Sequence, residues 1–113
     1  MPPKTNPLKL NPLQLKTLTL LQEIVREPRF GTPDPASGDV KINGLPHAHG
    51  SHMHVGAYLV HGADATGLDN PGVWAALGRK GLVRQDDSGH YLTRLGAEYE
   101  TGMRETILHG SDH

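Results

Sequence analysis

Histidines are the residues of this sequence whose type and spacing best suit chemistry. The chain of 113 residues holds eight of them, and four fall in one short stretch, at His47, His49, His52 and His54. Neutral imidazole is the commonest side-chain ligand for zinc, copper, nickel and iron. Two histidines two positions apart on a strand point the same way, so His52 and His54 are placed to share one ion. His47 and His49 would complete a four-nitrogen site across a hairpin, with zinc or another divalent transition metal as the candidate cofactor.

Simpler interpretations of these histidines stay open. A histidine-rich loop can be polar surface without any ligand. Residues 50–53, Gly-Ser-His-Met, also match a common expression-tag remnant, although they lie inside the chain. A pH-sensing role is a weaker alternative, because several imidazoles would gain charge together in mild acid.

The sequence offers little for catalysis. The chain has no cysteine, which excludes disulfides, a thiolate metal site and a cysteine nucleophile. It also lacks a glycine-rich phosphate loop, a His-Glu-x-x-His helix and a serine in a nucleophile-elbow context. We therefore expect a protein that is not an enzyme. Because there is no cysteine, no signal-peptide stretch and no apolar run near the roughly 20 residues of a membrane span, we expect a cytoplasmic protein with no membrane partner.

The charge balance limits what a nucleic-acid surface could look like. Lysine and arginine together number 11, aspartate and glutamate 12, and the formal net charge is -1. Any basic surface must therefore come from local clustering. Arg79, Lys80 and Arg84 lie within six positions, and Arg94 follows soon after; such side chains can neutralise phosphates. They are opposed locally by Asp69, Asp86 and Asp87.

The first half of the chain contains one strong element and one irregular stretch. Asn11 followed by Pro12 is typical of a helix start, and apolar residues then recur at spacings of three and four, which predicts a helix over about residues 12–27. The prolines and glycines that follow predict an irregular insert over 28–56, which includes a hairpin. Within this insert we expect a strand at about 39–43 and its partner strand at about 52–56. A short helix is expected to follow at about 57–66.

The second half is marked by turn and cap residues. Asn70 and Pro71 are typical of a helix start and Gly81 of a helix end, which predicts a helix over about residues 71–80. The turn residues Asp-Asp-Ser-Gly then predict a hairpin between 82–85 and 90–93. A last helix is expected over about 93–108. Its apolar residues, at spacings of four, exceed the needs of one small core and predict a homodimer: Leu95, Tyr99, Met103 and Ile107.

Three stretches resemble winged helix-turn-helix regulators. Residues 73–83, Val-Trp-Ala-Ala-Leu-Gly-Arg-Lys-Gly-Leu-Val, look like a recognition helix and the first wing strand. Residues 91–96, Tyr-Leu-Thr-Arg-Leu-Gly, look like the second wing strand entering the closing helix of MarR-like and PadR-like proteins, and residues 10–15 with Leu18 and Leu21 resemble their first core helix. The resemblance covers about residues 10–30 and 57–105.

This resemblance implies a fold class that is α+β and mainly helical. A single winged-helix domain would span residues 11–108, with a β-hairpin wing and a long irregular insert after the first helix. A flexible arm over 1–10 would precede it, and a tail over 109–113 would follow.

The implied function is that of a transcriptional regulator which binds double-stranded DNA as a homodimer. The helix from Pro71 would enter the major groove, which needs small or polar residues on its outer side. A metal or another effector at the histidine-rich segment would modulate it. A winged-helix protein–protein interaction module without DNA binding is the alternative, favoured by the net charge and the long insert. The candidate DNA contacts are Asn70, Gly72, Ala75, Arg79, Lys80, Arg84, His90 and Arg94.

Overall fold

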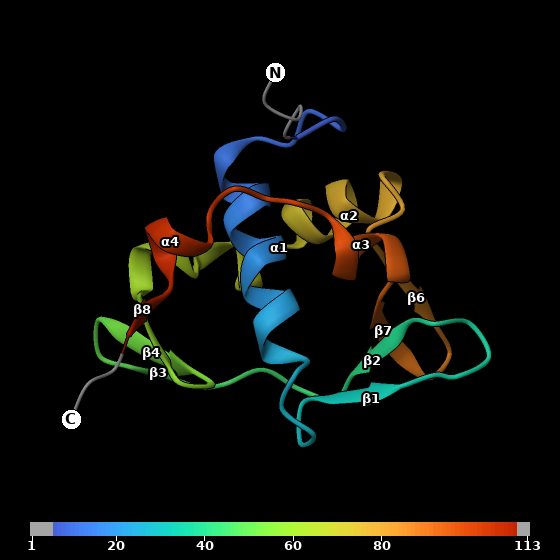
Figure 1. The fold of residues 1–113 in the computed structure, drawn as a ribbon, viewed down its shortest axis with the longest axis horizontal. Coiled ribbons are helices and arrows are strands. Elements are labelled where there is room, and N and C mark those ends of the chain that lie inside the picture. The colour runs from blue at the N-terminus through green and yellow to red at the C-terminus, as the bar shows by residue number, and fades with distance from the viewer. Residues whose placement is uncertain (1–5, 111–113) are drawn as a thin grey trace.

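The structure is a computed structural model that describes residues 6–110, apart from the side chain of His49. Within this part, the chain forms four α-helices, two short 3-10 helices and eight short strands in two antiparallel sheets. Figure 1 shows helix α1 in the middle, with one sheet on each side of it. The two sheets and the helices share one hydrophobic core, in which Leu18, Leu20 and Leu21 of α1 are fully buried.

Helix α1 (Pro12–Ile24) confirms the first predicted helix, although it ends three residues earlier. Asn11 Oδ1 accepts a hydrogen bond from Gln14 N at 2.8 Å, and Gln14 Oε1 accepts one from Asn11 N at 3.0 Å. This reciprocal cap satisfies two backbone N–H groups that a helix start leaves without partners. The helix is thereby fixed at its first turn, and its buried side chains form the centre of the core: Leu18, Leu20, Leu21 and Ile24.

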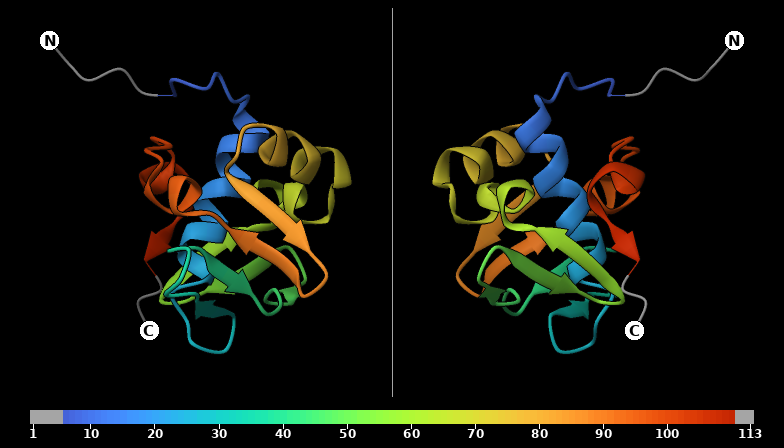
Figure 2. Two further views of the ribbon diagram at one scale, coloured as in Figure 1. Left: turned by 90° about the vertical axis from the view of Figure 1, so that its right-hand side faces the viewer. Right: turned by 90° about the vertical axis from the view of Figure 1, so that its left-hand side faces the viewer.

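Sheet A comprises four strands in the order β1-β2-β7-β6: β1 (Gly31–Pro33), β2 (Val40–Ile42), β7 (Gly89–Leu92) and β6 (Val83–Asp86). The hairpin predicted at 82–93 is confirmed as β6–β7, and Figure 2 (left) shows the two strands side by side with α2 above them. The hairpin predicted between 39–43 and 52–56 is wrong, because β2 pairs with β1 on one side and β7 on the other. This pairing sets Val40 opposite the fully buried Leu92.

Sheet B also has four strands, in the order β3-β4-β5-β8: β3 (Ala48–His49), β4 (His52–Val55), β5 (Tyr58–His61) and β8 (His109–Gly110). The short helix predicted over 57–66 is therefore wrong in its first half. That stretch is strand β5, since Val60 pairs with Met53 and both side chains are buried in the core. Two 3-10 helices follow, η1 (Gly62–Asp64) and η2 (Thr66–Asp69).

Helix α2 (Pro71–Arg79) confirms the second predicted helix. The last predicted helix, over 93–108, is wrong as a single element: it divides into α3 (Arg94–Glu98) and α4 (Arg104–Ile107). Gln22 Nε2 donates to Gly96 O at 2.9 Å and to Tyr99 O at 2.8 Å, so a side chain of α1 takes carbonyls that a continuing helix would use. Gly102 then adopts a positive φ of 70°. The homodimer prediction rested on apolar residues along one helix, and these residues are divided between two helices and their caps: Leu95, Tyr99, Met103 and Ile107.

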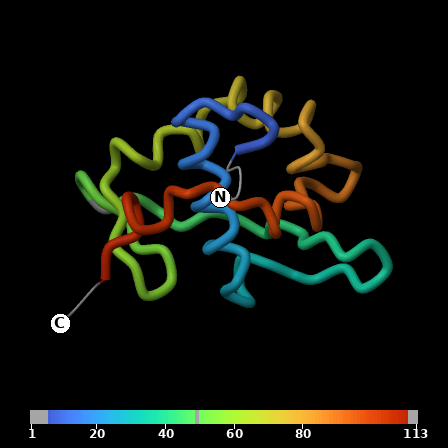
Figure 3. The backbone as a smooth tube through the Cα atoms, turned by 45° about the horizontal axis from the view of Figure 1, so that its top comes forward, coloured from blue at the N-terminus to red at the C-terminus, as the bar shows by residue number. Residues whose placement is uncertain are grey.

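The prediction of a mainly helical winged-helix fold is wrong. The described residues form an α+β fold in which two four-stranded antiparallel sheets hold more strand than such a fold has. The predicted irregular insert contributes strands to both sheets, and residues 43–47 carry the chain from one sheet to the other (Figure 3). The chain returns to sheet A at 83–92 and ends in sheet B at 109–110, so the two sheets alternate along the sequence.

The structure describes part of the predicted N-terminal arm and part of the predicted C-terminal tail. Residues 1–5 of the expected arm and 111–113 of the expected tail lie outside the described residues. Leu10 is buried, and Leu8 N donates to the hydroxyl of Tyr99 at 3.0 Å, so residues 6–10 pack against the domain. None of the helices within residues 6–110 has the length and apolar character needed to cross a membrane.

Candidate functional site

One face of sheet A carries two parallel rows of side chains. Residues opposite each other in antiparallel strands share a face, so the register defines both rows. The inner row packs toward the core and consists of Val40, Leu92 and Val83. The outer row lies two residues away on each strand and consists of Ile42, His90 and Gln85. Helix α2 lies beside the outer row and leaves it partly uncovered.

A groove of about 710 Å³ lies between this outer row, helix α2 and the chain around residues 43–45; we call it the α2 groove. Most of its lining is apolar or small: Ile42, Gly44, Leu45, Leu68, Pro71, Trp74, Ala75, Gly78 and Val83. Its polar lining residues are Asn43, Asp69, Arg84, Gln85 and His90. A concave, largely apolar surface with a few polar groups is the usual form of a binding site.

Helix α2 forms the wall of this groove because of its residue spacing. Asn70 Oδ1 accepts from Gly72 N at 2.9 Å and caps the helix, whose inner side is held by the buried Val73 and Leu77. Trp74 lies one step further round and is only half-buried. Its Nε1 donates to Leu68 O at 2.9 Å, and its ring centroid lies 5.1 Å from that of His90. The indole is thus fixed by a hydrogen bond and a ring contact at the side of the groove.

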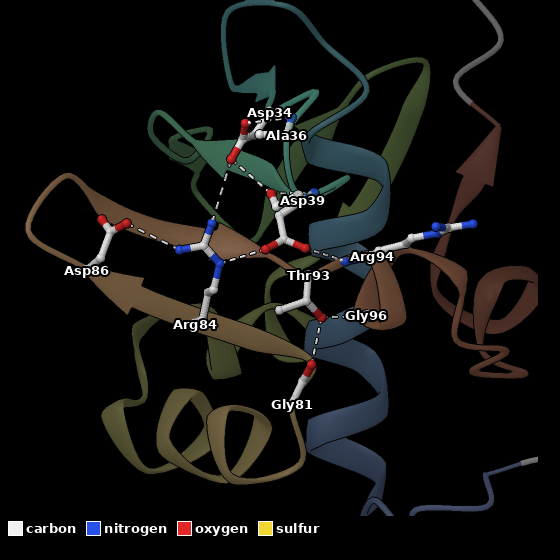
Figure 4. A network of polar contacts seen from close by, with 10 residues as sticks. Asp34, Ala36, Asp39, Gly81, Arg84, Asp86, Thr93, Arg94 and Gly96 are labelled. Carbon is white, nitrogen blue, oxygen red and sulfur yellow. Dashed lines mark hydrogen bonds and ion pairs between the residues drawn. The ribbon is translucent and has the colours of Figure 1, made fainter.

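Arg84 is held by carboxylates on the other face of sheet A (Figure 4). Its Nε lies 2.6 Å from Asp39 Oδ2, its Nη1 3.2 Å from Asp86 Oδ2 and its Nη2 3.9 Å from Asp34 Oδ2. The guanidinium also lies over the ring of Tyr91, 3.8 Å from the centroid. Three acidic groups therefore surround one cation, and the charge of Arg84 is neutralised within the molecule.

Asp39 is the best-connected acid of this network. Its Oδ1 accepts from the backbone N–H of Arg94 at 2.9 Å, and only 9% of the residue is exposed. The hydrogen bond from Arg84 holds the pKa of Asp39 below its usual range and raises that of Arg84. The pKa of Asp86 is also lowered, mainly by the bond from Ser88 N. The network therefore joins the β1–β2 loop, β6 and the start of α3.

The predicted DNA contacts fall into four groups. Gly72, Ala75, Arg79 and Lys80 are exposed along α2 and its end, and the two cations form no ion pair with any residue in 6–110. His90 and Arg84 line the α2 groove, but the guanidinium of Arg84 is bound as described. Arg94 lies at the start of α3, where its Nε is 3.4 Å from Glu98 Oε2. Asn70 serves as the cap of α2.

The predicted histidine ligands are not brought together as a group of four. His52 and His54 share one face of β4, and their ring centroids lie 5.2 Å apart. His47 is exposed and precedes β3, while the side chain of His49 lies outside the described part. Among the side chains that the structure describes, no three histidines, aspartates or glutamates lie close enough to hold a metal ion.

Sequence reasoning missed two sets of residues. Trp74, Ile42 and Leu45 were not identified as groove residues, because the approach of residues 42–45 to α2 depends on sheet pairing between distant segments. His61 and His109 were also missed, although their ring centroids lie 4.9 Å apart. No alternation signalled His61, because residues 58–61 read Tyr-Leu-Val-His, with two aliphatic residues in succession.

Comparisons with known proteins add no relative to this description. No protein-family model matches the chain, and neither a curated protein nor a solved structure was found to be similar to it.

Proposed function

We propose that this chain is a non-enzymatic binding module that holds a short segment of a partner protein in the α2 groove. The observation that carries the proposal is an apolar lining left open to solvent. Trp74, Ile42 and Leu45 pack against the core but are only half-buried. Exposed apolar concavities of this kind are where proteins take ligands and partners.

The position of strand β6 favours an extended segment as the occupant. β6 is an edge strand of sheet A, and Val83, Arg84 and Gln85 line the groove. An edge strand presents backbone groups that a further strand can pair with, and alternate side chains of that strand then enter neighbouring pockets. The occupant would pair with β6 and place an apolar side chain against Trp74.

The charge of the groove favours a basic residue beside that apolar side chain. Asp69 and Arg84 are the charged residues that line the groove, and Arg84 is already neutralised by carboxylates. Asp69 forms no ion pair within residues 6–110. Opposite charge at an interface steers association and selects partners. The partner segment would therefore combine an apolar residue with a lysine or arginine.

Selection from random peptides displayed on phage tests this function with the full chain. Enriched peptides should combine an apolar residue with a basic one, and a synthetic copy should change the emission of Trp74, the one tryptophan of the sequence. Ala75→Lys places a long, positively charged side chain in the groove, where it repels the basic residue of the partner, and should weaken binding at least about tenfold. Ala63→Lys, an exposed change in η1, is the matched control. Peptides that bind Ala75→Lys as tightly as the parent chain would overturn the proposal.

Binding of double-stranded DNA as a cytoplasmic, homodimeric regulator is the second candidate. A specific observation favours it: the outer side of α2 is exposed and small at Gly72, Ala75 and Gly78, and Arg79 lies at its end. A helix of this kind can approach base edges closely. The weak local surplus of positive charge makes this the second choice, because phosphate contacts dominate the affinity of proteins for DNA.

Selection from random-sequence DNA, followed by gel shifts, separates the two functions. If DNA is the partner, Arg79→Ala with Lys80→Ala should weaken binding and reduce the slope of log affinity against log salt by about 2. Arg26→Ala with Arg29→Ala removes the same charge from an exposed site at the end of α1 and serves as control. An enriched DNA sequence that both double variants bind equally well would exclude α2 as the contact.

A further inference from the structure

Sheet B has an apolar inner face and an outer face rich in imidazoles. Met53, Val55 and Val60 are buried against the core. Because side chains alternate along a strand, the residues between them point to the other face. The register sets His52 opposite His61 and Leu59 opposite His109, so these residues share the outer face. Three strands thus contribute histidines to it: His52, His54, His61 and His109.

The rings of His61 and His109 already have the separation that a shared ion requires. Their centroids lie 4.9 Å apart, with the ring planes at 58°. Two imidazoles bound to one ion, with metal–nitrogen bonds of about 2.0–2.1 Å and an angle between 90° and 110°, have centroids roughly 4.5–5.2 Å apart. The separation of the two rings is therefore one that a shared ion would give.

A second observation points to a ligand at this pair. His109 Nε2 is buried, and it has no hydrogen-bond partner within the described part of the chain. A buried polar atom without a partner is unfavourable, and such an atom is rare in a folded protein. Coordination to a metal would satisfy this nitrogen.

The backbone that carries His109 is anchored by the helix before it and by its own strand. The preceding helix α4 is tied to α1, because Arg104 Nη2 lies 2.9 Å from Glu23 Oε2, and this contact raises the pKa of Arg104. His109 itself belongs to β8, which pairs with β5. The imidazole thus projects from a fixed strand, which suits a ligand that must keep its geometry.

We propose that His61 and His109 form a two-imidazole site for a divalent transition-metal ion such as zinc, nickel or copper. Imidazole nitrogen favours these ions over magnesium and calcium, which prefer oxygen ligands. The described side chains bring no third histidine or carboxylate into the site, so water would fill the other positions. The site lies on sheet B, whereas the α2 groove is lined by sheet A, and Figure 1 shows these two sheets on opposite sides of α1. The site does not depend on the function proposed for that groove.

Calorimetric titration of the full chain with zinc, nickel and copper tests the site. One ion should bind per chain, and His61→Gln and His109→Gln should each weaken binding at least about tenfold. His90→Gln on sheet A and His47→Gln before β3 are matched controls and should leave binding unchanged. Absence of binding overturns the proposal, and so does binding that survives both ligand changes or is lost in His47→Gln.

Two measurements do not depend on how well the variants fold. In nuclear magnetic resonance of the unchanged protein, zinc should first shift the ring signals of His61 and His109. Shifts confined to other histidines would overturn the assignment. Metal should also raise the midpoint of thermal unfolding of the unchanged chain, because an ion that binds the folded state stabilises it. No change in that midpoint at saturating metal would count against a site that joins β5 to β8.

Discussion

Arg84 lies among three carboxylates, and its position shows how much a single residue depends on distant segments. It was expected to contact phosphate, because Arg79 and Lys80 precede it closely in the sequence. Asp39 lies 45 positions away and meets Arg84 only because β2 and β6 belong to one sheet. No local sequence pattern predicts such a contact. The availability of a basic side chain for a partner is therefore decided by sheet pairing.

Asp39→Asn should destabilise the protein at neutral pH by about 1–3 kcal/mol, since the charged oxygens accept from Arg84 and from the backbone of Arg94. The pKa of Asp39 is lower in the folded state than in the unfolded state, so its contribution is present at neutral pH and is lost as the pH falls below about 4. Urea unfolding at pH 7 and pH 3 should show a smaller difference for the variant. Asp87→Asn, which removes an exposed charge, should behave like the parent.

Gly96→Ala should destabilise the protein by about 1–3 kcal/mol, because a Cβ would meet the carbonyl oxygen of Leu82 and the side chain of Leu92. Gly78→Ala provides the contrast, since the nearest contacts of a Cβ there are at 3.9 Å or more and the residue lies in the last turn of α2. Alanine there should stabilise the helix by about 0.5–1 kcal/mol. Urea unfolding curves measure both changes, and equal effects would contradict the packing described at Gly96.

At the scale of elements, the sequence predicted the helices and the hairpin that are marked by residues close together in the chain. Asn11 and Asn70 mark the starts of α1 and α2, and the turn before Gly89 marks the β6–β7 hairpin. The partners of β2 and the strand character of 58–61 were not predicted, because register depends on residues far apart in the sequence. The same limit applied to the site. Helix α2 was expected, whereas the groove beside it was not.

The break between α3 and α4 is an element-scale effect with a test of its own. Gln22→Ala removes two hydrogen bonds to the carbonyls of Gly96 and Tyr99 and should cost about 1–3 kcal/mol. Amide hydrogen exchange should rise mainly in residues 94–107. Gln85→Ala, at an exposed position of β6, should change stability by no more than about 0.5 kcal/mol. Equal exchange in both variants would mean that the side chain of α1 does not fix the end of α3.

At the scale of the whole molecule, the core is one cluster shared by both sheets and α1. We therefore expect a single cooperative transition. Trp74 reports on the region of sheet A, and far-ultraviolet circular dichroism reports on the whole backbone. Thermal curves from the two probes should coincide. Two separate midpoints would show that the sheets unfold independently.

The alternation of the chain between its two sheets restricts how this protein can be divided. A cut after residue 61 would leave sheet A without β6 and β7, and a cut after residue 92 would leave sheet B without β8. No single cut of the chain yields two fragments that each contain a complete sheet. A gene for half of this sequence would therefore encode no self-sufficient unit, and any fusion that uses the domain must carry residues 6–110 unbroken, because α1 supplies the centre of the core.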